Sequence, residues 1–118
     1  MSLTVYHYAK CSTCKKAIKW LDARGLEYKL IDIVEKPPSK SALKKIAKAA
    51  DLPPTKLFNT SGMSYRSGNF KEKSKSMSAD EIFTALAADG KLIKRPLVSG
   101  DGVALVGFKE PTYEDALG

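Results

Sequence analysis

The start of the chain changes its hydrophobic period twice, and this feature restricts the fold more than any other. Residues 3–8, "LTVYHY", are rich in β-forming side chains and predict a strand. The next apolar residues have the spacing of one helix face and are Cys14, Ala17, Ile18 and Leu21. This helix should end with Gly25 as its cap, and "EYKLIDIV" at 27–34 predicts a second strand. Strand, helix and strand at this spacing indicate a βαβ unit with two parallel strands.

The middle of the chain predicts helices and a poorly anchored loop. A helix should begin near Ser39. Its apolar face would consist of Leu43, Ile46, Ala47 and Ala50. Residues 59–77 are rich in Ser, Gly, Asn and Lys and contain few apolar anchors. We therefore expect short helical turns there and the most mobile part of the chain.

The last third predicts a helix, a hairpin and a short final helix. Ser78 and Glu81 have the spacing of a capping box, and the helix that they begin should end at Gly90. "RPLVSGDGVALVGF" at 95–108 predicts two short strands joined by a tight turn. The final helix should have Thr112 as its cap. The order of elements is βαβ, helices, then ββα, without repeats or a linker.

Composition and charge limit the class of protein. A chain of 118 residues has the length of one domain, and its charged fraction of 28% is ordinary for a globular protein. No apolar run approaches the length of a membrane span, and the N-terminus does not resemble a signal peptide. We therefore expect a cytoplasmic monomer. The net charge is +7, but the lysines are spread along the chain and no recognition helix is apparent. This pattern favours a solvated basic surface over direct nucleic-acid binding and leaves an acidic protein partner open.

Both cysteines of the chain lie in "CSTC", where the first strand gives way to the first helix. Cys11 falls at the helix start, where free N–H groups and the helix dipole favour a thiolate, and Lys10 adds positive charge. Cys14 faces the core one turn later and can reach back to Cys11. We interpret Cys11 as the nucleophile of a redox pair and Cys14 as the resolving thiol.

Two other interpretations of the cysteines remain open. A zinc site needs four ligands, whereas the chain offers two cysteines and His7, so zinc is disfavoured. Two ordinary buried cysteines would explain Cys14 but explain poorly a cysteine among lysines at a helix start. His7 by itself is more typical of a strand residue than of a catalyst.

A second candidate site is "KRPLV" at residues 94–98. Pro96 precedes a predicted strand and is a candidate for a cis peptide bond. The guanidinium of Arg95 could bind an anion held near Cys11, since guanidinium groups bind oxyanions through two hydrogen bonds. An exposed arginine at the strand edge is an equally good interpretation from sequence.

The chain resembles the ArsC/Spx family over nearly its whole length. The resemblance is carried by "VYHYAKCSTCKKAIKWL", "DIVEKPPSKSALKKIAK" and "LIKRPLVSGDGVALVGF". It implies an α/β, thioredoxin-like fold with a mixed four-stranded sheet and a helical insertion. The single domain, 1–118, would comprise a thioredoxin-like core at about 1–35 and 91–118 and an insertion at about 36–90.

The arsenate reductases of this family use one cysteine and three arginines that bind arsenate, and they take electrons from glutathione and glutaredoxin. The resemblance matches Cys11 to the nucleophile, His7 to the strand histidine and Arg95 to one arginine. The second arginine falls at Asn59. The third falls at Gly107 or Phe108, where the nearest cation is Lys109. Two of three oxyanion ligands are missing, at a cost of about 1.5–3 kcal/mol each, so we expect poor arsenate reduction.

Regulators of the Spx type carry a CxxC motif, as this chain does, and bind the C-terminal domain of the RNA polymerase α subunit without binding DNA alone. A third subgroup resembles glutathione-linked thiol reductases. The best hypothesis is a thiol–disulfide oxidoreductase with no bound cofactor or metal, supplied with electrons by glutathione, glutaredoxin or thioredoxin; the alternative is an Spx-like regulator. The substrate-binding residues that we expect are His7, Lys10, Ser12, Thr13 and Pro96.

Overall fold

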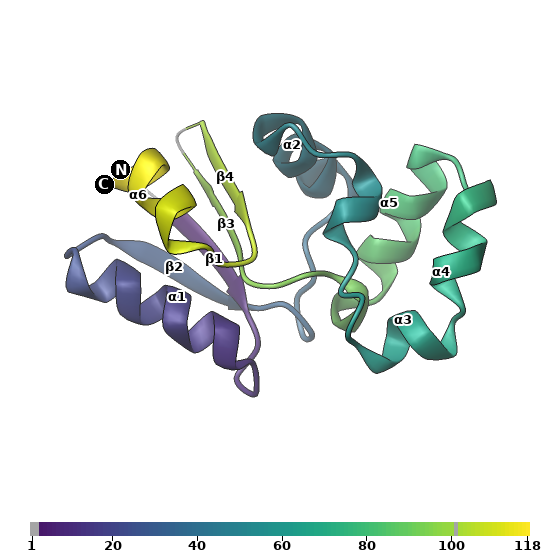
Figure 1. The fold of residues 1–118 in the computed structure, drawn as a ribbon, viewed down its shortest axis with the longest axis horizontal. Coiled ribbons are helices and arrows are strands. Elements are labelled where there is room, and N and C mark those ends of the chain that lie inside the picture. The colour runs from purple at the N-terminus through teal and green to yellow at the C-terminus, as the bar shows by residue number, and fades with distance from the viewer. Residues whose placement is uncertain (1–2, 101) are drawn as a thin grey trace.

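The computed structural model describes residues 3–100 and 102–118 and contains a four-stranded sheet with helices on both faces (Figure 1). The strand order is β2-β1-β3-β4. The strands are β1 (Leu3–His7), β2 (Tyr28–Asp32), β3 (Leu97–Gly100) and β4 (Val103–Val106). β1 is parallel to β2 and antiparallel to β3, and β4 is antiparallel to β3. The predicted βαβ unit and the mixed sheet are therefore confirmed.

The helices follow the order that the sequence predicts. They are α1 (Ser12–Ala23), α2 (Lys40–Ala50), α3 (Met63–Ser67), α4 (Phe70–Lys73), α5 (Ala79–Ala88) and α6 (Glu110–Leu117). Single 3₁₀ turns occur at Pro54–Leu57, Ser74–Ser76 and Gly90–Leu92. The side chain of Ser39 accepts a hydrogen bond at the start of α2, and Ser78 and Glu81 form the predicted capping box of α5. After α1 the cap is Arg24, and Gly25 follows it with a φ of 66°.

Two hydrophobic clusters lie on opposite faces of the sheet. α1 and α6 cover the face of Val5, Val98 and Leu105, with Trp20 and Tyr113 between them. The helices between β2 and β3 pack around the other cluster, and Figure 1 shows α2 to α5 gathered on that side of the molecule. Successive side chains of a strand point to opposite faces of the sheet, so β1, β3 and β4 each contribute side chains to both clusters. Within the two described ranges, no helix combines the length and the apolarity needed to cross a bilayer.

Two local predictions need correction. Thr112 does not cap the last helix, because α6 begins at Glu110 with Lys109 as its cap. Pro111 fits this first turn, since its fixed φ suits a helix and its missing N–H would have no partner there. Residues 59–77 form short helical turns as predicted, but they are anchored. The rings of Tyr65 and Phe70 pack 5.4 and 5.5 Å from that of Phe58, between ring centroids.

Candidate functional site

Cys11 lies at the junction of β1 and α1, as the sequence predicts. It is the N-cap of α1, and its Sγ accepts a hydrogen bond from the backbone N–H of Cys14 at 3.2 Å. Its own backbone N–H donates to the carbonyl of Tyr8 at 3.0 Å, which closes the turn after the strand. The Cys11 side chain is half-buried, so its sulfur is open to a reactant at the positive end of a helix.

Cys14 lies one helical turn behind Cys11 and is buried, with 1% of its surface exposed. Burial is the main cause that raises the pKa of the Cys14 thiol to about 12, and a hydrogen bond with the Cys11 side chain adds to it. Both cysteines are free thiols in this structure. The pair therefore consists of one accessible sulfur and one buried thiol that stays protonated near neutral pH.

Cys11 opens into a hollow of about 400 Å³, which we call the Cys11 pocket. It is lined by Lys10, Cys11, Ser12, Thr13, Asn59, Ser61, Lys94, Arg95, Val106, Gly107, Phe108 and Lys109. The structure thus gathers five of the predicted site residues around one cavity. The other three, His7, Cys14 and Pro96, are not among these lining residues.

Arg95 lines the Cys11 pocket and also a neighbouring hollow of about 200 Å³ that Tyr8 lines. Its guanidinium lies over the Tyr8 ring, 4.8 Å from the centroid. One of its nitrogens, Nη1, is buried and has no hydrogen-bond partner among the described residues. The bond from Arg95 to Pro96 is cis, as predicted. A buried guanidinium donor without an acceptor is costly, and an anionic group that accepted a hydrogen bond from it would remove that cost.

The turn after β4 forms another wall of the Cys11 pocket, and hydrogen bonds fix both backbone groups of its glycine, Gly107. Gly107 has a φ of 77°, which favours glycine. Its N–H donates to the carbonyl of Pro96, and its carbonyl accepts from the hydroxyl of Tyr113, both at 2.8 Å. The stem of Lys94 crosses this glycine, since a Cβ there would lie 3.0 Å from Lys94 Cε. The sequence placed Lys94 in the second candidate segment without giving it a role, and it did not single out Tyr113, because only the folded chain brings the two residues to the site.

His7 lies at the end of β1, outside the Cys11 pocket. It is paired in register with Asp32 of the parallel strand β2. Hydrogen bonds from the backbone N–H groups of Glu35 and Val34 are the main causes that hold the pKa of Asp32 below its usual value, and His7 contributes less. The structure therefore places this histidine beside a carboxylate on the neighbouring strand.

The family is decided by a match over most of the chain. The model of the ArsC family matches residues 6–116. The chain belongs to the ArsC family. This ArsC-family chain is 52% identical over 115 residues to the uncharacterized protein YusI of Bacillus subtilis (strain 168), and the match covers 98% of both proteins.

Solved structures agree with this assignment. A Bacteroides fragilis protein described as related to the ArsC family is 40% identical, with a TM-score of 0.94 and 98% of each chain covered. A possible arsenate reductase from Streptococcus mutans UA159 is 43% identical, with a TM-score of 0.87 and 96% and 95% of the chains covered. More distantly, the global transcriptional regulator Spx of Listeria innocua is 23% identical over 92% of this chain and 81% of its own length.

Proposed function

We propose that this ArsC-family protein is a thiol–disulfide oxidoreductase. In the first step the Cys11 thiolate attacks a substrate disulfide, forms a mixed disulfide and releases one substrate thiolate. In the second, Cys14 loses its proton to solvent and attacks the Cys11 sulfur, which releases the second substrate thiolate. The enzyme is left with a Cys11–Cys14 disulfide, so two electrons have passed from its dithiol to the substrate.

The observation that carries this proposal is the arrangement of the two sulfurs. Cys11 lies at a helix start inside a cationic pocket, and the backbone N–H of Cys14 donates to its sulfur. Cys14 is buried one turn behind it, where it cannot meet the substrate first. Such a division between an accessible attacking thiol and a buried resolving thiol suits disulfide exchange.

The electron donor would restore the dithiol by the reverse exchange. Glutathione, glutaredoxin or thioredoxin would suffice, and the reaction needs no bound cofactor. Arsenate should be a poor substrate, because Asn59 and Gly107 or Phe108 stand where the arsenate reductases of the family are expected to carry arginines. Lys94 and Lys109 line the pocket but do not offer the two parallel donors of a guanidinium.

The raised pKa of Cys14 leads to a direct test of the two steps. We expect the reduced protein to release thiolate from 5,5′-dithiobis(2-nitrobenzoate) in two phases, a fast one from Cys11 and a slower one from Cys14. Below pH 12 the Cys14 thiolate fraction grows about tenfold per pH unit, so the slow phase should accelerate by about that factor. Stopped-flow absorbance between neutral pH and pH 9 measures both phases.

The Cys14→Ser variant is the control for this assignment. It should keep the fast phase and lose the slow one, and mass spectrometry should then find the aryl adduct on Cys11. A slow phase that is independent of pH, or one that persists in Cys14→Ser, would contradict the resolving role. Failure of the unsubstituted protein to form a Cys11–Cys14 disulfide after reaction with the reagent would contradict the whole proposal.

Arg95 should favour reactants that carry negative charge near the disulfide. We expect Arg95→Gln to slow the reaction with anionic dithiobis(nitrobenzoate) by about tenfold, because a charge-assisted hydrogen bond is lost. Neutral dithiodipyridine should be affected by less than about threefold. Arg66→Gln is the matched control, since Arg66 is exposed on α3 and does not line the Cys11 pocket. An equal slowing of both reagents would contradict an anion-binding role.

The alternative function is a redox-sensing regulator of the Spx type. It is favoured by the CxxC motif and by the match to the Listeria regulator over most of this chain. Such a protein would bind the C-terminal domain of the RNA polymerase α subunit, with an affinity set by the Cys11–Cys14 disulfide. Titration of oxidised and reduced protein with that domain tests this alternative. Equal affinities of the two forms for the domain would contradict it.

A further inference from the structure

The strand β4 is an edge strand, and half of its backbone groups point away from the sheet. Leu97 of β3 faces Val106 of β4, and the N–H of Gly107 donates to the carbonyl of Pro96. In an antiparallel pair, every second residue of a strand forms its backbone hydrogen bonds with the partner strand. Because Gly107 bonds to Pro96, the residues of β4 that bond to β3 are Val103 and Leu105. The N–H and C=O groups of Ala104 and Val106 therefore lie on the outer edge. Such an edge is a template for another strand.

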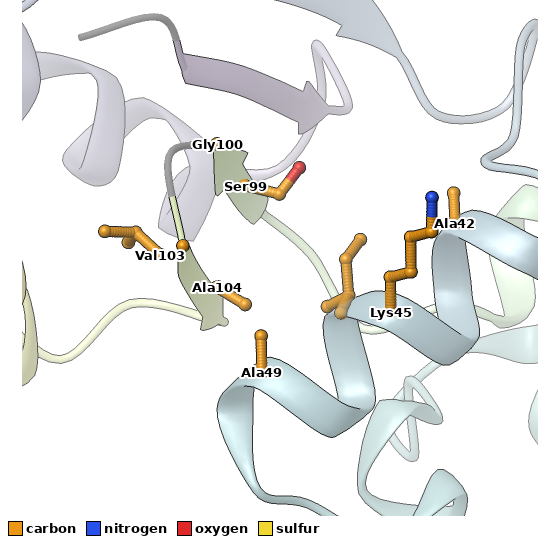
Figure 2. Close-up of a pocket in the computed structure, with 9 residues that line it drawn as sticks. Ala42, Lys45, Ala49, Ser99, Gly100, Val103 and Ala104 are labelled. Carbon is orange, nitrogen blue, oxygen red and sulfur yellow. The ribbon is translucent and has the colours of Figure 1, made fainter.

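Two hollows follow this edge toward Cys11. One, of about 370 Å³, lies between α2 and the β3–β4 hairpin, where Ala49 points toward Ala104 (Figure 2). The other, of about 390 Å³, lies beside Ala104 and Val106 and reaches the start of α6 at Thr112. It shares Ala104 with the first hollow and Val106 with the Cys11 pocket. We call these two hollows the β4 groove, and its second hollow adjoins the Cys11 pocket.

The charges at the Cys11 end of this path are positive. Lys56 lines the β4 groove, and Lys94 and Lys109 line both the groove and the Cys11 pocket. Lys10 and Arg95 line the pocket but not the groove. None of the described residues that line the second hollow or the pocket is acidic. The path therefore combines free strand-pairing groups with an electrostatic preference for an acidic chain.

We propose that the β4 groove docks an extended, acidic segment of a protein substrate, which pairs with β4 and brings its disulfide to Cys11. This inference rests on the proposed function and names its substrate class. The segment would donate and accept hydrogen bonds at Ala104 and Val106, place small apolar side chains in the groove, and direct its carboxylates to Lys56 and Lys109. The exchange chemistry at Cys11 is unchanged.

The opposite edge of the sheet does not serve this purpose. β2 is also an edge strand and carries an exposed leucine, Leu30, with 46% of its surface accessible. However, no residue of β2 lines the β4 groove or the Cys11 pocket. A segment paired with β2 would therefore not be led to Cys11, and this edge supplies the control.

The test uses the reduced full-length protein and short peptides whose single cysteine is joined to thiopyridine by a disulfide. Attack by Cys11 releases the thiopyridine, whose absorbance gives the rate. An acidic, strand-forming peptide should react at least about tenfold faster than the same peptide with lysine in place of its acidic residues. The difference should shrink as salt screens the charges. Backbone N-methylation of the acidic peptide at alternate residues should cost about tenfold by removing a strand-pairing donor.

Charge reversals on the protein separate the two edges of the sheet. Lys56→Glu should lower the rate with the acidic peptide by about fivefold to tenfold and raise the rate with the lysine peptide. Lys29→Glu makes the same change on an exposed residue of β2 and should alter neither rate. Equal rates for all peptides, or equal effects of the two variants, would overturn the docking proposal.

Two readouts keep this proposal apart from the proposed function. Small, neutral dithiodipyridine reports the chemistry of Cys11 without docking, so a protein that fails with it fails the proposed function. Docking itself is measured in Cys11→Ser by NMR, with a peptide whose cysteine is replaced by serine. The amide signals of Ala104 and Val106 should shift with the acidic peptide. Signal shifts confined to Leu30 on β2, or the absence of any shift, would overturn the docking proposal, even if the protein reacts with dithiodipyridine.

Discussion

Replacing Cys11 with serine is expected to lower disulfide turnover by at least about a thousandfold. A serine hydroxyl at neutral pH is a far weaker nucleophile than a thiolate, and the other cysteine, Cys14, is buried and cannot replace it. The measurement is an NADPH-coupled assay that offers a model disulfide and arsenate side by side, with the glutathione/glutaredoxin and thioredoxin systems in separate reactions. We expect turnover of the disulfide to exceed that of arsenate, and the active system names the electron donor.

The Cys14→Ser variant is the informative partner in the same assay. It should retain the attack by Cys11 but leave resolution to an external thiol, so its turnover should depend more steeply on glutathione concentration. Residual activity of Cys11→Ser close to that of the parent chain would refute the assignment of the nucleophile. No turnover in any system, with a disulfide that forms and reverses, would instead favour the Spx-like regulator.

The Gly90→Ala substitution should cause the largest loss of stability outside the site. Gly90 begins the 3₁₀ turn before β3, and a Cβ there would overlap the carbonyl oxygen of Ile33 and lie 2.7 Å from its carbonyl carbon. Both groups belong to the backbone, so the clash cannot be relieved by turning a side chain. We expect a loss of at least about 3 kcal/mol in the free energy of unfolding, a large share of a typical domain's stability.

Urea unfolding followed by the fluorescence of Trp20, the only tryptophan of the chain, measures this loss. Gly25→Ala is the matched control. At Gly25 the φ is 66°, but no atom outside the glycine and its two chain neighbours lies within 4 Å of the added Cβ, so only backbone strain of about 1 kcal/mol is expected. Similar losses for the two variants would show that close packing against Ile33 is not what requires glycine at position 90.

Local sequence patterns accounted for most of the secondary structure. Ser39, Ser78 and Glu81 are caps whose hydrogen bonds span only three residues, so their spacing alone identifies them. The prediction for Thr112 was wrong because Pro111 could occupy the first turn of α6, and a capping residue competes with that arrangement. The short helices near Tyr65 were underestimated because their anchor, Phe58, lies outside the segment.

Only part of the candidate site follows from local sequence, and the rest depends on contacts between distant segments. The place of Cys11 at a helix start follows from the strand and helix periods that flank it. The wall of its pocket does not, because Lys94 and Gly107 line the pocket with Cys11 only after β3 and β4 have joined the sheet, and Tyr113 holds Gly107 from α6. A sequence pattern reports neighbours along the chain, whereas this wall depends on contacts between its two ends.

The hydrogen bond from Tyr113 to Gly107 also bears on how the protein is made. The ribosome synthesises Cys11 and Cys14 before α6, the helix whose Tyr113 supports the opposite wall of the pocket. A nascent or truncated chain can therefore display a thiol without the cationic cavity that selects its reactant. Off-pathway oxidation of newly made protein would then be governed by the two cysteines alone, and the proposed selectivity of the Cys11 pocket would arise only when α6 docks.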